Sequence, residues 1–187
     1  MRTIHVFNQV TIDGFFSDAK GDMSWAHKQG ADPEWAKFGA DNAKGGGELL
    51  FGRKTYDMMA SYWPTAEAAK QSPEIAAGMN RMTKFVFSTT LDKPAWANTK
   101  VLNGDVAKIV RDLKQGDGPN ITIMGSGTIV SQLAQAKLID ELMLVTVPIV
   151  LGTGKTMFET VKERFSLKPT STRTFKNGNV LVTYVPA

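Results

Sequence analysis

Two short glycine-containing segments in this sequence have residue types that bind phosphate groups. They are the runs Gly52-Arg53-Lys54-Thr55 and Gly125-Ser126-Gly127-Thr128. Each follows an apolar run and precedes an amphipathic one, so each predicts a turn from a strand into a helix. A helix N-terminus offers unpaired backbone N–H groups and a partial positive charge, and glycine lets a phosphate approach the backbone. Either segment alone is as typical of an ordinary tight turn, but the two together favour a phosphate site.

Cations and hydroxyls near the first segment indicate which phosphate it would bind. Arg53 and Lys54 oppose the dipole of the helix they begin, which favours an anionic ligand, although an ordinary solvated helix start has the same composition. Arg can donate two parallel hydrogen bonds, which suits a 2′-phosphate. The next predicted strand ends in three hydroxyl side chains, Ser88, Thr89 and Thr90.

Four carboxylates are candidates for moving a proton or orienting a substrate, namely Asp13, Asp22, Asp32 and Glu34. Asp13 precedes a glycine and is typical of a turn. Asp32 precedes Pro33, a pattern typical of a helix N-cap, and this structural role is as well supported as catalysis.

Aromatic side chains could line a pocket for a planar heterocycle, although they more often fill protein cores. The candidates are Trp25, Trp35, Phe38, Tyr56 and Trp63. Trp25 is the best supported because it lies in a polar loop. We assign Trp25 and Asp13 to the substrate-binding side of the site.

Several other chemistries lack the residues they need. The chain has no cysteine, which excludes disulfides, thiolate nucleophiles and zinc ribbons. Its two histidines, His5 and His27, have no metal-ligand spacing, so we predict no metal site. The segment 152–156 lacks the first glycine of a P-loop, and Val130 stands where the dinucleotide fingerprint after Gly125 requires its last glycine. No G-x-S-x-G elbow indicates covalent catalysis.

Strands alternating with helices must position these residues. Apolar patterns predict strands over 4–12, 49–51, 85–87, 120–124 and 141–147. Helical spacing predicts helices that begin after Asp32, Gly52, Asp105 and Ser126. Asn177-Gly178, between 165–175 and 180–185, predicts a two-residue hairpin. This alternation implies a largely parallel sheet covered by helices on both faces, with an antiparallel edge.

Length and composition are those of a single globular domain over residues 1–187. The hydrophobic fraction of 42% and the charged fraction of 21% are near the globular average. The net charge of +4 is spread along the chain, which gives little support for nucleic-acid binding. Since no signal peptide or membrane-length apolar stretch is visible, we expect a cytoplasmic protein without membrane contact.

Taken in order, these motifs resemble the dihydrofolate reductase fold and, within it, the C-terminal reductase domain of the bacterial riboflavin-biosynthesis deaminase/reductase. The resemblance covers nearly the whole chain and rests on the segments 10–14, 23–25, 50–56, 85–91, 124–127, 138–142 and 148–158. It implies a three-layer α/β/α sandwich with NADPH across the sheet. It also implies that Arg53, Lys54, Ser88 and Thr89 surround the adenosine phosphate and that 125–128 lies under the pyrophosphate. Because no deaminase part precedes the reductase part, we expect a stand-alone relative.

The resemblance also implies a carboxylate on the first helix that binds the substrate three residues before a tryptophan. Asp32 stands three before Trp35, and Glu34 is the second choice. No arginine falls clearly where a folate tail would be held, since Arg81 is one place off. We therefore expect an NADPH-dependent reductase of a small planar polar substrate, similar to a pterin, a pyrimidine or a riboflavin precursor.

Two alternatives to this function stay open, a non-catalytic NADPH-binding or sensor protein and a true dihydrofolate reductase. A homodimer is also expected, by family analogy and because the C-terminal hairpin provides an edge strand.

Overall fold

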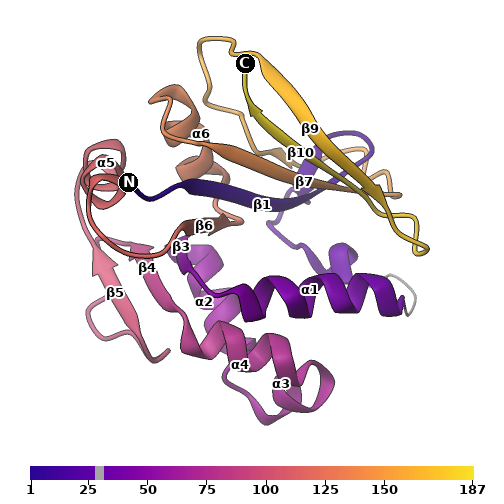
Figure 1. The fold of residues 1–187 in the computed structure, drawn as a ribbon, viewed down its shortest axis with the longest axis horizontal. Coiled ribbons are helices and arrows are strands. Elements are labelled where there is room, and N and C mark those ends of the chain that lie inside the picture. The colour runs from indigo at the N-terminus through magenta and orange to yellow at the C-terminus, as the bar shows by residue number, and fades with distance from the viewer. Residues whose placement is uncertain (28–31) are drawn as a thin grey trace.

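Eight strands form one sheet in the computed structural model, which describes residues 1–27 and 32–187 (Figure 1). Across the sheet they lie in the order β5-β4-β3-β6-β1-β7-β10-β9. Their bounds are β1 (Ile4–Thr11), β3 (Glu48–Gly52), β4 (Thr83–Phe87), β5 (Thr99–Leu102), β6 (Ile121–Met124), β7 (Glu141–Val147), β9 (Leu167–Thr174) and β10 (Val180–Pro186). All pairs from β5 to β7 are parallel, and β10 pairs antiparallel with β7 and β9. The predicted mostly parallel sheet with an antiparallel C-terminal edge is confirmed.

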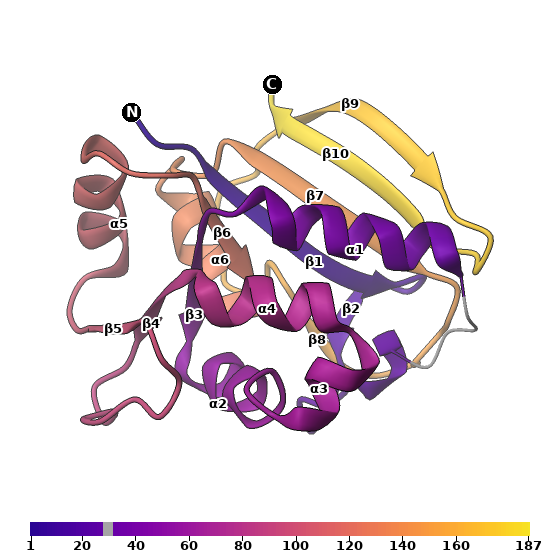
Figure 2. The ribbon, with the colours of Figure 1, turned by 60° about the horizontal axis from the view of Figure 1, so that its bottom comes forward.

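Helices cover both faces of the sheet, as the alternating pattern predicts (Figure 2). One face carries α1 (Pro33–Gly45), α2 (Arg53–Tyr62), α3 (Ala66–Gln71) and α4 (Pro73–Arg81), and the other carries α5 (Val106–Gln115) and α6 (Gly127–Gln135). Both faces of the inner strands are therefore buried, as in most parallel sheets. In the described parts of the chain, no helix is long and apolar enough to cross a membrane.

Side chains on neighbouring positions of one strand enter different cores. In β3, Leu50 packs with residues of α5 and α6, whereas Leu49 and Phe51 pack with residues of α2 and α4. A third cluster joins α1 to β7 and to the C-terminal hairpin, and it includes Val145 and Phe175. The strict alternation of side chains in a strand makes this two-sided core.

The C-terminal hairpin forms at the predicted turn. Asn177 and Gly178 lie in the turn, but residues 175–179 connect β9 to β10 and Phe175 N–H donates to Asn179 O, so the connection is longer than the predicted two residues. Gly178 has a φ of +88°, a left-handed conformation that glycine adopts without strain.

Several short elements are absent from the predictions. These are α3, α4, β5, a 3-10 turn η1 (Ser24–His27) and a two-stranded ribbon of β2 (Phe15–Ser17) with β8 (Lys155–Thr156). The segments of the ribbon are distant in the chain, so no local pattern reveals their pairing. The predicted loop from Gly14 to Asp32 contains β2 and η1, and its part at 28–31 lies outside the described residues.

Lys84, in β4, is a lysine with no exposed surface. Its Nζ donates to Asn80 O at 2.9 Å and Met82 O at 2.8 Å, and it lies 4.4 Å from the ring centroid of Trp96. Burial lowers the pKa of Lys84 from 10.5 to about 8.

Lys84 should make stability depend on pH. Between pH 8 and 10.5 the unfolded chain binds a proton that the folded protein releases, so the free energy of unfolding rises with pH. Relative to Lys84→Met, we expect the wild-type protein to gain up to about 3 kcal/mol across this window in urea unfolding. Lys93→Met, at an exposed position, is the control and should parallel the wild-type curve. A flat difference between wild type and Lys84→Met would contradict the lowered pKa.

Candidate cofactor and substrate site

The two glycine-containing junctions lie side by side at the carboxyl edge of the sheet. β3 and β6 are parallel neighbours, so α2 and α6 both begin at the same edge. Hydrogen bonds join the junctions directly: Gly52 N–H donates to Ser126 Oγ at 2.6 Å, and Ser126 N–H donates to Thr55 Oγ1 at 3.2 Å. Ser126 Oγ also lies 3.0 Å from Thr55 Oγ1. The segments 52–55 and 125–128 are therefore in direct contact, and their phosphate-binding role stays a prediction.

The turn before α6 has an unusual backbone. Gly125 has a φ of +62° and Ser126 a φ of +54°, so two consecutive residues are left-handed. A side chain at Gly125 would meet Thr55 Oγ1 and Cγ2 at 2.8 Å, which explains the glycine. The left-handed conformation is sterically unfavourable for Ser126, and residues other than glycine, Asn and Asp seldom adopt it. Such strain is concentrated at functional sites.

Neither helix at this edge has a side-chain cap. The N-cap residues Gly52 and Ser126 accept no hydrogen bond from the first turns of α2 and α6 through a side chain. The first N–H groups of a helix have no partner inside the helix. In this arrangement, the first N–H groups of α2 and α6 and the positive ends of both helix dipoles are available to an anion.

A cavity of about 320 Å³ lies beside the start of α2. It is lined by Arg53, Phe87, Ser88, Thr89, Thr90, Leu102, Asn103, Gly104 and Val106. Ser88 Oγ accepts from Thr90 N–H at 3.1 Å and from Leu91 N–H at 3.0 Å, so the hydroxyl proton is left for another acceptor. Three of the predicted phosphate-binding residues thus share one cavity, whereas Lys54 is exposed and is not part of its lining.

Asp57, one turn along α2, orients the Arg53 guanidinium. Arg53 Nε lies 2.8 Å from both carboxylate oxygens of Asp57, and Nη1 lies 3.4 Å from Thr90 Oγ1. The remaining guanidinium donors are free to bind a planar anion.

A second cavity, of about 280 Å³, lies near the end of β1. It is lined by Val10, Gly14, Leu144, Thr156, Met157 and Phe158, so its wall is largely apolar. Met157 also lies against the first residue of α6, because a side chain at Gly127 would meet Met157 Cα at 3.5 Å. This apolar cavity therefore lies next to the start of α6.

Asp32 is engaged as a structural residue, whatever its role toward a substrate. It is 6% exposed, and its Oδ1 accepts from the N–H groups of Glu34 and Trp35 at 2.9 and 3.3 Å. Its Oδ2 accepts from Asn177 N–H at 3.0 Å. Burial by itself would raise the pKa of Asp32, but the surrounding backbone N–H groups outweigh it and lower the pKa. The predicted N-cap is confirmed, and the catalytic role stays a prediction.

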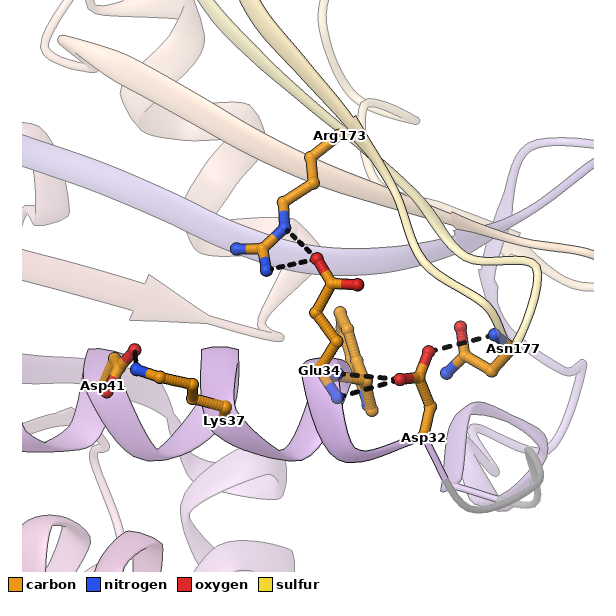
Figure 3. A network of polar contacts seen from close by, with 7 residues as sticks. Asp32, Glu34, Lys37, Asp41, Arg173 and Asn177 are labelled. Carbon is orange, nitrogen blue, oxygen red and sulfur yellow. Dashed lines mark hydrogen bonds and ion pairs between the residues drawn. The ribbon is translucent and has the colours of Figure 1, made fainter.

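The Glu34 side chain extends from α1 toward Arg173 of the C-terminal hairpin (Figure 3). Its Oε1 accepts from Arg173 Nη2 at 2.7 Å and from Nε at 3.2 Å. The Arg173 guanidinium also lies 4.6 Å from the ring centroid of Phe175. Both predicted carboxylates thus contact the C-terminal hairpin, and Glu34 is about half exposed.

The other two carboxylates hold loops together. Asp13 accepts from Thr11 Oγ1 at 2.6 Å and, through Oδ2, from Gly152 N–H at 2.7 Å. The Thr11 hydrogen bond, followed by the backbone N–H groups of 151–152, lowers the pKa of Asp13 against the opposing effect of burial. Asp22 accepts from Ser24 Oγ at 2.6 Å. Asp13 therefore ties the end of β1 to the segment after β7, and its substrate-binding role stays a prediction.

The five candidate aromatic residues lie in two cores rather than around one pocket. Tyr56 and Trp63 pack between α2, α4 and the sheet, while Trp25, Trp35 and Phe38 belong to the cluster beneath the hairpin. Trp25 is buried, and among residues 1–27 and 32–187 its Nε1 has no hydrogen-bond partner. This free donor is the feature that keeps Trp25 a candidate for binding a polar group.

One residue of the site is missing from the sequence-based set. Asn8 is buried in β1, where the positions before and after it on the same face are Val6 and Val10. It contacts Gly125 through two hydrogen bonds. The signal that could have identified Asn8 is a single amide side chain on a strand face that is otherwise apolar, because a buried amide needs hydrogen-bond partners.

The site residues lie along the edge in the order of the strands. Ser88 follows β4, Gly52 ends β3, Gly125 follows β6, and Val10 and Leu144 lie in β1 and β7. At about 4.8 Å per strand this edge is about 19 Å long. Within 1–27 and 32–187, no group of three or more His, Cys, Asp or Glu side chains could hold a metal ion.

Comparison with known proteins agrees with this arrangement. Protein YyaP of Bacillus subtilis (strain 168) is 32% identical over 178 residues, which cover 94% of this chain and 90% of YyaP. The crystal structure of a putative riboflavin biosynthesis protein from Shewanella sp. PV-4 superposes with a TM-score of 0.74 at 22% identity, over 99% of both chains. Dihydrofolate reductase from Enterococcus faecalis, complexed with NADP(H), superposes with a TM-score of 0.58 at 15% identity, over 98% of this chain and 96% of that one.

The fold of this chain is therefore that of the dihydrofolate reductases, as the sequence motifs predict. The family model of the RibD C-terminal domain matches residues 2–181, which is nearly the whole chain. On this match, the protein belongs to the RibD C-terminal domain family.

Proposed function

We propose that this protein binds NADPH and transfers a hydride to a small planar polar substrate, similar to a pterin, a pyrimidine or a riboflavin precursor. The observation that carries the proposal is the order of groups along the carboxyl edge of the sheet. A cavity with a cation and hydroxyls, two uncapped helix N-termini and an apolar cavity follow one another from β4 to β7. Ligands of open α/β sheets bind at this edge.

The residues near β4 are suited to bind the 2′-phosphate on the adenosine part of NADPH. Arg53 would supply its remaining guanidinium donors, and Ser88 would donate its hydroxyl proton, because the lone pairs of its oxygen already accept two N–H groups. Thr89 lines the same cavity. This set of donors supports NADPH over NADH, because only NADPH has the 2′-phosphate.

The residues at the two junctions fit a pyrophosphate. Gly52, Thr55 and the segment 125–128 would bind it with the uncapped N–H groups of α2 and α6. Glycine at 125 and 127 lets this turn pack closely against its neighbours, because a side chain would meet Thr55 at Gly125 and Phe16 at Gly127. The related enzyme from E. faecalis was crystallised with NADP(H), which supports the same cofactor here.

When bound, NADPH supplies the hydride. The chain itself would contribute position and the exclusion of water, because the apolar cavity near the end of β1 leaves few polar groups to compete with the substrate. Asp32 or Glu34 stays our candidate to orient the substrate or relay a proton, although neither lines either of the two cavities and both contact the C-terminal hairpin on the α1 side of the sheet. Trp25 and Asp13 stay our candidates for the substrate side. These four assignments are proposals that variants can separate.

A cytoplasmic location and a homodimer also remain predictions. β9 and β5 are the edge strands of the sheet, and an edge strand invites pairing. β9 carries Lys168, Pro169 and Arg173, which are residue types typical of edges that avoid pairing. A dimer built on another surface is compatible with this edge.

Replacing Arg53 tests the cofactor assignment. We expect Arg53→Ala to weaken NADPH binding by about 1.5–3 kcal/mol, or about ten- to a hundredfold, because charged hydrogen bonds are lost. NADH binding should change less than about twofold. Titration with tryptophan fluorescence measures both, and Arg111→Ala, at an exposed position of α5, is the matched control.

The outcomes of this titration separate the alternatives. Equal binding of NADPH and NADH would overturn the 2′-phosphate assignment, and no binding of either would overturn the reductase. NADPH binding without consumption of NADPH on any pterin, pyrimidine or riboflavin precursor would favour the non-catalytic alternative. Tight antifolate binding would favour a true dihydrofolate reductase.

Replacing Asp32 separates its structural role from a catalytic one. Asp32→Ala should lower the thermal midpoint by about 2–8 °C, because α1 loses its N-cap and the hairpin loses an acceptor. Glu34→Ala should lower it by less than about 2 °C, because its ion pair is exposed. NADPH affinity should be kept in both variants.

Asp32→Asn then tests the chemistry, because Asn retains an N-cap acceptor. With a substrate found in the screen above, a turnover drop of more than tenfold at unchanged NADPH affinity is expected if the carboxylate acts on the substrate. Unchanged turnover would remove Asp32 from the reaction and leave Glu34→Gln as the next variant.

A further inference from the structure

Asn8 is a buried amide at the centre of the sheet that the proposed reaction does not use directly. It is 3% exposed, and it lies on the side of β1 that otherwise packs into the core with α5 and α6. An amide in such a position costs stability unless its donor and acceptor are satisfied. The identity of its partners therefore indicates what it is for.

Asn8 binds the peptide groups of one residue, Gly125. Asn8 Oδ1 accepts from Gly125 N–H at 2.5 Å, and Asn8 Nδ2 donates to Gly125 O at 3.3 Å. The ladder between β1 and β6 ends at the pair of Phe7 with Met124, one residue earlier. The Asn8 side chain thus extends the pairing to a residue that has left the sheet.

Gly125 is the first of the two left-handed residues in the turn that begins α6. Thr55 contacts the second, Ser126, from the side of α2. Asn8 and Thr55 therefore fix the turn from two sides, from β1 and from the first turn of α2. A strained turn persists only when its surroundings over-determine it, and these are the side-chain hydrogen bonds that do so.

Asn8 has a third contact that connects the turn to the apolar cavity. Its Nδ2 donates to Met157 Sδ at 2.9 Å, and Met157 lines that cavity. Ser131, in α6, donates through Oγ to Met157 O at 2.9 Å. The segment carrying Met157 is thereby attached both to β1 and to the helix.

We propose that Asn8 is a positioning residue that holds the turn 125–127 in the conformation that binds the pyrophosphate of the cofactor. It acts through Gly125 and touches no cofactor atom itself. The inference rests on the proposed function, since it presumes that NADPH binds at this edge. Asn8 serves the pyrophosphate end of the site alone, because the cavity near Arg53 is formed by β4, α2 and the residues after β5.

A comparison of two ligands tests this assignment. NADPH contacts both ends of the site, whereas adenosine 2′-phosphate reaches only the cavity lined by Arg53 and Ser88. Asn8→Val removes the hydrogen bonds to Gly125 and keeps a residue type that suits a buried strand. We expect it to weaken NADPH binding about tenfold or more and to change adenosine 2′-phosphate binding less than about twofold.

Asn179→Val is the matched control, because Asn179 is also a fully buried amide but its side-chain atoms have no hydrogen-bond partner in the structure. It should leave the affinity of both ligands within about twofold of wild type. Circular dichroism and urea unfolding establish that each variant is folded. Asn8→Ser, smaller and polar, undergoes the same two titrations, so that the result does not depend on the packing of valine.

Each outcome decides the assignment. NADPH binding within twofold of wild type in both Asn8 variants would overturn it, and so would an equal loss of both ligands, which indicates a general structural effect. An Asn8 variant that fails to fold, alongside a folded Asn8→Ser that binds NADPH normally, would overturn it as well. A wild-type protein that binds neither ligand would instead overturn the proposed function, and this inference with it.

Discussion

Parallel pairing of β3 with β6 brings the N-termini of α2 and α6 to the same edge of the sheet, and this pairing organises the site. Each helix presents uncapped N–H groups and the positive end of its dipole there. Two such ends side by side repel each other unless an anion lies between them or polar groups separate them. The hydrogen bonds among Gly52, Thr55 and Ser126 join the two ends, and their uncapped N–H groups are left for a ligand.

The polarity of the carboxyl edge of the sheet differs on the two sides of the junction between α2 and α6. Toward β4 the edge has Arg53, with its guanidinium oriented by Asp57, and the Ser88 hydroxyl, whose lone pairs already accept two N–H groups. Toward β1 and β7 it has an apolar cavity. A ligand suited to this gradient is anionic at one end and flat and less polar at the other. A phosphorylated dinucleotide has this distribution, and the cofactor named for the E. faecalis relative is one.

The opposite side of the molecule depends on a different set of contacts. α1 is attached to the C-terminal hairpin by the Asp32 contact with Asn177, by the ion pair of Glu34 with Arg173, and by Trp35 against Phe175, whose ring centroids lie 5.0 Å apart. Asp32 and Glu34, the carboxylates we propose for the substrate side, therefore hold the first helix in place. A substitution at Asp32 perturbs this structural role, so stability has to be measured together with turnover.

The sequence by itself determined the elements whose signals are local. Alternation from Ile4, the Asp32-Pro33 helix start, the glycines that end strands and begin helices, and Asn177-Gly178 each depend on a few neighbouring residues, and each is found where it was predicted. The order of motifs determined the family and, through it, the expectation that Arg53, Ser88 and 125–128 surround one cofactor; the strand order came from the structure. Short helices such as α3 and the ribbon of β2 with β8 were missed, because their signals are brief or come from segments far apart in the chain.

Only the tertiary structure decided how individual side chains are used. Asp13 and Asp32 have the chemistry of catalytic groups, but their partners, the backbone N–H groups of Gly152 and Asn177, come from distant segments that no local pattern relates to them. Asn8 looks out of place in an apolar strand until the peptide groups of Gly125, 117 residues away in the chain, are found beside it. A side chain's role depends on which groups compensate its burial, and long-range packing alone selects those groups.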